Sequence, residues 1–511
     1  MKQGLFISAL VSIVTAFAFI GCAENHDSYS SAIYSTTDFK ISRRFELITP
    51  QTTPSIQVFN QANQVVANAQ VLIGSAVGAP FRDNLKITDS NGFVALPEWT
   101  ETTHITVNAQ GYIRQTLLNQ KPGTFQIKLN TAYMTTRPVI KGQVTGLPVK
   151  NGDKMTDFSL VLPTIAKGDL MTFDLDAIVS PFDDTVNIIF GKTADLPSNV
   201  SLPTQTEKFN FLISLTLSKP EHRVYTTNYG QKTFYAFSGK FPFKEVMDQL
   251  NADKQFYEVM NLFEYTNGSI REANVNSPTT ALNIPSGEIK FDGATANVKS
   301  AAIAADEVVM MFALNDLSGG RFVPSDLKRL DANQSASLKT IAGKPVHIVS
   351  LLKKAIDYDS ATRDSANRTS ASMVAYKTGM QSSLLPLLPA GPTVVDQGGA
   401  YKITIPQASN RTLDAQAINP LAVSVSISNI NKVQDGQVQV DILDRKWEVL
   451  GTGWPNEITL PVWPLEDSED ATAVKRKFEV NLIGSETSAQ TDLGDDLVKA
   501  ATHVTKGSVE L

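Results

Sequence analysis

The sequence predicts a mostly β protein, with several β-sandwich-like modules in series and one or two helices. Two observations support this fold class. Apolar and polar residues alternate with a period of two in many separate segments, which is the pattern of strands that bury one face. Asn, Asp and Gly residues lie between those segments, where tight turns are expected. With 511 residues, the chain is long enough to build several hydrophobic cores.

Residues 1–21 have the composition of a secretory signal peptide. Lys2 supplies a positive charge, and an apolar run over residues 5–20 follows it. That run is shorter than the roughly 20 apolar residues that a membrane-spanning helix needs. Residues 22–54 are polar and rich in serine and threonine, so we expect them to form a flexible tether ahead of the first folded domain.

The residues around Cys22 resemble the lipobox of bacterial lipoproteins, in which apolar and small residues precede a cysteine; here they are Phe19, Ile20 and Gly21. The resemblance implies cleavage before Cys22 and attachment of fatty acyl chains, palmitate among them, to its thiol. Two or more such chains hold a protein stably at a membrane. By the sorting rule of Gram-negative lipoproteins, Ala23 implies the outer membrane, without indicating which face. The alternative is an ordinary signal peptide in which Cys22, the only cysteine of the chain, has no role.

The charge balance and the missing enzyme motifs narrow the function. With 45 basic and 51 acidic residues the net charge is −6, which disfavours nucleic acid as a partner. The sequence contains no His-Glu-x-x-His, Walker or Gly-x-Ser-x-Gly motif and no cluster of Cys and His. Its five histidines are scattered along the chain. We therefore predict no catalytic residues, no metal and no cofactor, and a non-enzymatic role is favoured.

Residues 55–130 show the clearest strand pattern. Ala69 and Val71 flank the polar Gln70, with Ile73 two residues further on, and Ile105 and Val107 flank Thr106. Period-2 runs of this kind, separated by Asn, Asp and Gly turns, predict a small antiparallel β domain.

Three motifs in this segment resemble the carboxypeptidase regulatory-like domain: VANAQVLI at 66–73, TDSNGF at 88–93 and AQGY at 109–112. That domain is a transthyretin-like sandwich of seven strands with a carbohydrate-binding-like fold. It is non-catalytic in the proteins that carry it. The resemblance therefore implies a β-sandwich over about 75 residues and no chemistry of its own.

Residues 131–300 continue the β pattern, and we expect one helix within them, from Phe243 to Tyr265. The apolar residues of this helix have the spacing of a face that packs on a core. A helix that lies on a membrane or binds a partner is the less favoured alternative.

The next two segments have weaker patterns. Residues 301–356 are expected to form an α+β segment, with an apolar strand at 308–312 and Ser325 as a helix cap. Residues 357–397 are small and polar and then interrupted by Pro and Gly, which favours a linker or long loop.

Residues 398–511 are predicted to form a C-terminal β domain. Alternation over 423–427 and again over 438–442 brackets Asp435 and Gly436, which predicts a hairpin.

Two groups of residues are candidates for ligand contact. Trp447, Trp454 and Trp463 lie within 17 residues of one another. Exposed aromatic rings stack on sugars or anchor protein interfaces, although packing in a core is the favoured role of these three. Asp174 and Asp176 would share one face of a strand, which would help them to bind calcium together, but no calcium-ligand spacing follows them, and carboxylates at a strand edge are more often only solvated.

These observations favour a lipid-anchored envelope or cell-surface protein with a non-enzymatic role in binding, adhesion or scaffolding. The expected partners are the membrane, through lipid on Cys22, and an envelope protein or polysaccharide. Two alternatives remain: an enzyme or enzyme accessory that acts on envelope or extracellular polymers, and a subunit of an outer-membrane assembly.

Overall fold

The fold comes from a computed structural model, which describes residues 53–511 except 75–84, 135, 149–153, 167–182, 190–191, 209–213, 251, 253, 255, 319, 359–366, 399, 436–437, 462–474, 488–492 and 494. The predicted signal peptide and Cys22 lie outside the described residues, as do Asp174, Asp176 and Trp463. Strands dominate the described chain, which confirms the predicted fold class. None of the described helices has the length and hydropathy that crossing a bilayer requires.

The first seven described strands form a sandwich. One layer has the order β4-β1-β7 and the other has the order β3-β2-β5-β6. Ile56, Phe125 and Ile127 from the first layer and Val71 and Ile105 from the second belong to one buried cluster. The resemblance to the carboxypeptidase regulatory-like domain implies such a sandwich, and membership of that family stays a prediction. The strands are β1 (Ser55–Asn60), β2 (Gln70–Ile73), β3 (Leu85–Ile87), β4 (Phe93–Ala95), β5 (Thr103–Asn108), β6 (Arg114–Gln120) and β7 (Thr124–Leu129).

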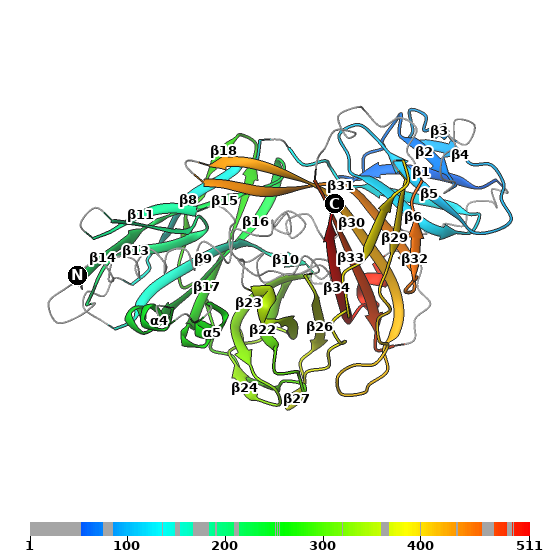
Figure 1. Cartoon of the computed structure of the whole chain (residues 1–511). Helices are drawn as coiled ribbons and strands as arrows, with labels where there is room; N and C mark the ends of the chain where they lie inside the picture. The colour runs from blue at the N-terminus through cyan, green and yellow to red at the C-terminus, as the bar shows by residue number, and fades with distance from the viewer. Residues whose placement is uncertain are drawn as a thin grey trace.

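The layer β3-β2-β5-β6 is one end of a thirteen-stranded sheet, which we call the long sheet (Figure 1). Its order is β10-β23-β22-β25-β26-β34-β33-β30-β31-β6-β5-β2-β3. Neighbouring strands are antiparallel, except that β31 and β6 are parallel. The added strands are β10 (Ile165–Ala166), β22 (Glu307–Ser318), β23 (Arg321–Leu330), β25 (Val346–Lys354), β26 (Thr369–Ala375), β30 (Asn419–Asp435), β31 (Val438–Thr452), β33 (Arg476–Ser485) and β34 (His503–Glu510).

Two three-stranded sheets pack on the long sheet. The sheet β28-β29-β32 lies on the C-terminal strands, where Ile403 joins Val425 and Phe478 in one buried cluster. The sheet β24-β21-β27 lies on the middle strands, where Val298 joins Met311. These strands are β21 (Ala296–Lys299), β24 (Ser335–Leu338), β27 (Met380–Gln381), β28 (Thr393–Asp396), β29 (Tyr401–Thr404) and β32 (Glu457–Thr459).

A further sandwich forms over residues 139–290. A six-stranded sheet of order β14-β13-β9-β16-β17-β20 packs on a four-stranded sheet in which β8 pairs with β15, β18 and β19. A separate pair, β11 and β12, precedes β13. The strands are β8 (Val139–Thr145), β9 (Thr156–Pro163), β11 (Asp183–Ile189), β12 (Lys192–Pro197), β13 (Val200–Lys208), β14 (Ser214–Lys219), β15 (Glu221–Tyr225), β16 (Gly230–Phe241), β17 (Glu264–Val275), β18 (Thr279–Ala281), β19 (Ile284–Pro285) and β20 (Ile289–Lys290).

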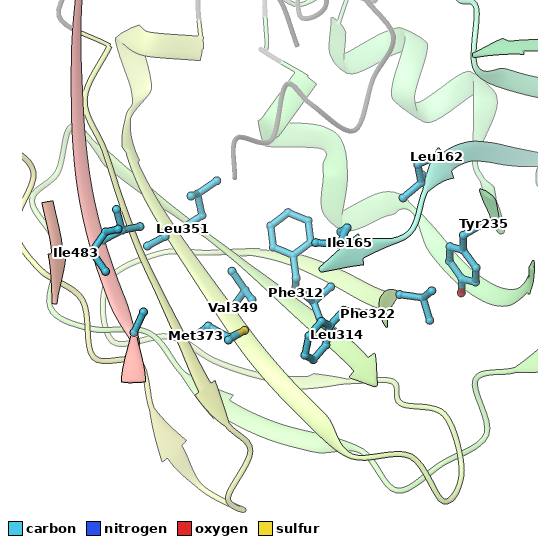
Figure 2. Packing of buried hydrophobic residues seen from close by; sticks show 14 of the residues in the cluster. Leu162, Ile165, Tyr235, Phe312, Leu314, Phe322, Val349, Leu351, Met373 and Ile483 are labelled. Atoms are coloured by element: carbon cyan, nitrogen blue, oxygen red, sulfur yellow. The ribbon is translucent and has the colours of Figure 1, made fainter. Parts of the chain in front are cut away.

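Side chains of the six-stranded sheet pack against the long sheet. Figure 2 shows Leu162 and Tyr235 on one side of this core and Phe312 and Phe322 on the other, with Ile165 between them. All five are buried. Burial of side chains of this size contributes about 1.5–3 kcal/mol each, so the two bodies of strands hold together through one shared apolar core.

The single helix predicted from Phe243 to Tyr265 is wrong. The structure has α4 (Phe243–Leu250), α5 (Phe256–Val259) and the 3-10 turn η2 (Met260–Leu262), and β17 begins at Glu264. Tyr265 stacks on Phe237 of the neighbouring strand at 4.2 Å between ring centroids. The aromatic residues at the end of the predicted helix therefore obey strand alternation, while Val246 and Val259 are buried as a core-packing face requires. A third short helix, α6 (Asp495–Ala500), lies near the C-terminus.

The predicted linker at 357–397 and the α+β segment at 301–356 are also wrong where the structure describes them. After the 3-10 turn η3 (Ala355–Tyr358), β26 lies in the middle of the long sheet between β25 and β34. Ser325 lies within β23, and its hydroxyl donates to Lys339 O at 2.6 Å. Ser370 of β26 likewise donates to Val504 O at 3.3 Å. Small hydroxyl side chains that are satisfied inside a sheet hide the apolar alternation that reveals other strands.

The predicted C-terminal hairpin is present as β30 and β31. Asp435 and Val438 form the last pair before the turn, whose two residues lie outside the described chain. The two strands span 17 and 15 residues, and Figure 1 shows them as a long arm that projects from the sheet. Arg137, just before β8, donates to Leu443 O on this arm at 3.3 Å.

Candidate functional site

The joint between the N-terminal sandwich and the hairpin arm brings together residues that lie hundreds of positions apart in sequence. β31 runs parallel to β6, with Trp447 opposite Arg114 and Val449 opposite Thr116. Because the hydrogen bonds of a sheet continue across this joint, the sandwich and the C-terminal strands form one body.

The ring of Trp447 is buried in the joint. Its Nε1 donates to Thr116 Oγ1 at 2.8 Å, and Thr116 Oγ1 is also 2.8 Å from Thr106 Oγ1 on the next strand. The guanidinium carbon of Arg114 lies 4.6 Å from the ring centroid, within the range of a cation–π contact. Since Trp447 is only 3% exposed, its ring offers no free face to a sugar. It packs in the core instead.

Polar side chains continue the joint beyond Trp447. Asn130 Nδ2 donates to Glu448 Oε2 at 3.0 Å, and Arg445 pairs with the other oxygen of Glu448 at 3.2 Å. Gln61 Nε2 donates to Asn130 Oδ1 at 3.0 Å. The carboxylate of Glu448 thus receives a donor from each side of the joint. Hydrogen bonds to a charged group contribute about 1.5–3 kcal/mol each when well shielded.

The side chain of Trp454 also packs against neighbouring residues. It is half-buried, and its Nε1 donates to Ile483 O at 2.8 Å within the C-terminal strands. A Cβ on Gly484 would lie 3.2 Å from its ring, so the indole covers that glycine. The other predicted contact residues, Trp463, Asp174 and Asp176, and the predicted lipid carrier Cys22 lie outside the described residues.

An ionic cluster that the sequence did not reveal lies in the sandwich of residues 139–290. Lys219 Nζ is 2.9 Å from Asp184 Oδ2, and Arg223 Nε donates to Asp184 Oδ1 at 2.7 Å. The Lys219 side chain is only 4% exposed. The ammonium also donates to three main-chain carbonyls, those of Ser198, Val200 and Glu221. Sequence spacing carries no signal for this cluster, because Asp184 is 39 residues from Arg223.

Three further titratable groups are buried, and each is in a different setting. Burial lowers the pKa of His222 to about 4, with help from the charge of Lys219. Burial alone lowers the pKa of Lys232 to about 7. Burial lowers the pKa of His503 to about 4, although its Nε2 lies 3.0 Å from Ser383 O. All three keep their neutral form more readily than they would in water.

The described residues hold no group of three or more His, Cys, Asp or Glu side chains arranged to take a metal ion. The contacts described above are used to join strands and to neutralise buried charge. The contacts of Trp447, Glu448 and Asp184 therefore hold the modules together.

Comparisons with known proteins leave the family open. No family model matches the sequence, and no curated protein matches it. Among solved structures, one similarity is to a chain described as the structure of the streptococcal ancillary pilin. It has 10% identity and a TM-score of 0.13, and covers 77% of this chain and 98% of that one. A TM-score this low assigns neither a fold nor a function.

Proposed function

We propose that the chain is a lipid-anchored envelope protein whose role is scaffolding or adhesion and not catalysis. The single observation that supports this most is the long sheet, which passes from the middle strands through the hairpin into the N-terminal sandwich without a break. A module joined through a continuous sheet keeps its position, whereas modules on free linkers move relative to one another. A rigid body of this kind suits a protein that spaces or presents a partner.

The anchor in this proposal is Cys22. Acylation of this thiol would hold the protein at the outer membrane, as its lipobox-like surroundings suggest. The partner would be an envelope protein or a polysaccharide. The two alternatives, an enzyme acting on envelope polymers and a subunit of an outer-membrane assembly, are kept as outcomes of the tests below.

The anchor is tested by expressing the full chain and its Cys22→Ser variant in the same bacterial host. Wild type is expected in the membrane pellet, with an N-terminal peptide that carries acyl mass. The Ser variant is expected to lose that mass and to leave the pellet. If the variant is processed normally and pellets with membranes, and wild type carries no acyl mass, the lipid anchor is wrong.

The role is tested by purification from detergent-solubilised membranes. A scaffold or adhesin is expected to bind cells, isolated envelope polysaccharide or an envelope protein without being recovered in a complex of fixed ratio. A stable partner at fixed ratio would support the assembly subunit instead. Turnover of an envelope polymer by the purified protein would contradict the non-enzymatic role.

A further inference from the structure

Two titratable side chains lie in one closed layer of the sandwich of residues 139–290. His222 is on β15 of the four-stranded sheet, and Lys232 is on β16 of the six-stranded sheet. Val224 and Phe234, two residues further along the same strands, belong to the apolar cluster between these sheets. Because alternate residues of a strand share a face, His222 and Lys232 point into this cluster as well. His222 is 0% exposed and Lys232 is 1% exposed.

Within the described part of the chain, the ring of His222 is closed in and has no hydrogen bond. Neither ring nitrogen has a hydrogen-bond partner among the described residues. The cross-strand neighbour of His222 on β8 is Gly142, and a Cβ on that glycine would lie 1.8 Å from Leu282 O. The backbone therefore closes tightly over this part of the layer, and water has no ready place to solvate an added charge.

The other strands that line the layer contribute aliphatic side chains. They are Ile140 and Val144 of β8, Val161 of β9, Ala236 of β16 and Ala273 and Val275 of β17. The charged group that acts on His222 is Lys219 at the end of β14, which repels an imidazolium. Asp184 of β11 and Arg223 of β15 bind each other, and Asp184 also binds Lys219. On β16, Lys232 Nζ donates to Asn228 Oδ1 at 3.1 Å.

We propose that this layer is an acid-sensitive element in which protonation of His222 loosens the four-stranded sheet from the six-stranded sheet, while the long sheet keeps its fold. Lys232 has an amide oxygen within hydrogen-bond distance and accepts a proton with a partner in place. His222 has no such partner in the described part of the chain, so its protonation leaves a cation without a hydrogen bond between two layers of aliphatic side chains. Opening of the strand pair β8–β15 is the simplest relief.

The pKa of His222 gives the pH window. Its folded-state value of about 4 lies below the ordinary value of 6.5. The contribution of neutral His222 to the stability of the layer is therefore complete above pH 6.5 and is lost as the pH falls toward 4. From this shift, local opening becomes on the order of 20-fold more frequent at pH 5 than at pH 7, and on the order of 100-fold more frequent at pH 4.

Hydrogen–deuterium exchange of the full chain at pH 7 and pH 5, corrected for intrinsic exchange rates, tests the proposal. In wild type, the protection factors of peptides covering β8 and β15 are expected to be about 20-fold lower at pH 5 than at pH 7, while those of peptides from β33 do not change. In His222→Leu the β8 and β15 peptides are expected to change less than about threefold. Should the Leu variant fail to fold, His222→Gln carries the same expectation.

The matched control is His347→Gln, on β25 in the long sheet, where the half-buried ring packs edge-on to Phe322. This variant is expected to keep the full acid response of β8 and β15. The proposal is overturned if wild-type β8 and β15 stay protected at pH 5, if β33 loses protection equally, or if the folded His222 variant opens as wild type does.

Discussion

The phenol of Tyr235 lies over Gly268 on the neighbouring strand, so that a Cβ on Gly268 would be 2.1 Å from the Tyr235 hydroxyl oxygen. That hydroxyl donates to Pro324 O at 2.8 Å on β23 of the long sheet. Tyr235 is thus one point at which a side chain links the six-stranded sheet to the long sheet; the exposed pair of Arg321 and Glu272 is another. Glycine at 268 gives the ring room to reach across.

Gly268→Ala is expected to destabilise the protein by about 1–3 kcal/mol, because the added methyl group displaces the Tyr235 ring from its hydrogen bond. Urea denaturation followed by tryptophan fluorescence measures the loss. Gly123→Ala is the control, since the nearest atom to its added Cβ would be 3.9 Å away. Equal midpoints for the two variants would show that the ring accommodates the methyl group.

Trp447→Phe is expected to cost about 2–3 kcal/mol, from the lost hydrogen bond to Thr116, the smaller ring and the weaker contact with Arg114. Exchange protection of β6 is expected to fall more than that of β33, because the joint itself is weakened. Trp454→Phe loses the same kind of N–H bond, here to Ile483 O, within the C-terminal strands. A comparable loss of β6 protection in both variants would contradict a specific role of Trp447 at the joint.

Asp184→Asn is expected to cost about 3–5 kcal/mol, because it removes the carboxylate that faces Lys219 and Arg223 in a shielded site. Chemical denaturation at neutral pH checks this. The control is Glu221→Gln, which removes the partner of Lys141 from a pair whose side chains are 47% and 52% exposed. That change is expected to cost less than about 1 kcal/mol. The cluster would be energetically unimportant if the Asp184→Asn and Glu221→Gln variants unfolded at the same denaturant concentration.

Lys232→Met is expected to flatten the dependence of stability on pH. The folded-state pKa of Lys232, about 7, lies below its ordinary value of 10.5. The contribution of Lys232 to the free energy of unfolding is therefore full above pH 10.5 and is lost as the pH falls to 7. Between pH 9 and pH 6 wild type loses about 2–3 kcal/mol for this reason, and the Met variant does not. At pH 9 the Met variant also loses the hydrogen bond from Lys232 to Asn228, which changes its stability by itself. The readout is therefore the slope of the free energy of unfolding against pH.

Lys244→Met serves as the reference for that measurement, because the Lys244 side chain is 55% exposed. It is expected to keep the wild-type slope between pH 9 and pH 6. A Lys232→Met protein that follows wild type over the same range would mean that Lys232 keeps its charge in the folded layer.

Local sequence pattern predicted several of the strands and one turn correctly, and its two main errors have separate physical causes. Ile105 and Val107 flank Thr106 in the sequence and are buried in β5, and Asp435 pairs with Val438 in the expected hairpin. β26 was missed because Ser370, Ala371 and Ser372 are small, and a small buried residue carries no hydrophobic signal. The helix at Phe243 was extended too far because apolar spacing alone does not separate a helix end from the strand that follows it.

The predicted contact residues illustrate the same limit. Trp447 and Trp454 are close in sequence and rich in contact area, which is compatible with a sugar platform or with a core. Only the position of Thr116, 331 residues away, decides for the core in the case of Trp447. The Asp184–Lys219–Arg223 cluster had no sequence signal, because charges that meet across strands have no fixed spacing.

What the sequence determined by itself is the β class and, for the strands whose residues alternate, which face is buried, since both follow from the alternation of side chains. The sequence also predicts that the chain is held at a membrane through lipid on Cys22. The tertiary structure alone decided which strands are neighbours, and so placed β6 beside β31 and made one sheet of three regions of the chain. The physical reason is that alternation reports which face of a strand is buried, while the partner strand is chosen by packing and hydrogen bonds among residues hundreds of positions apart.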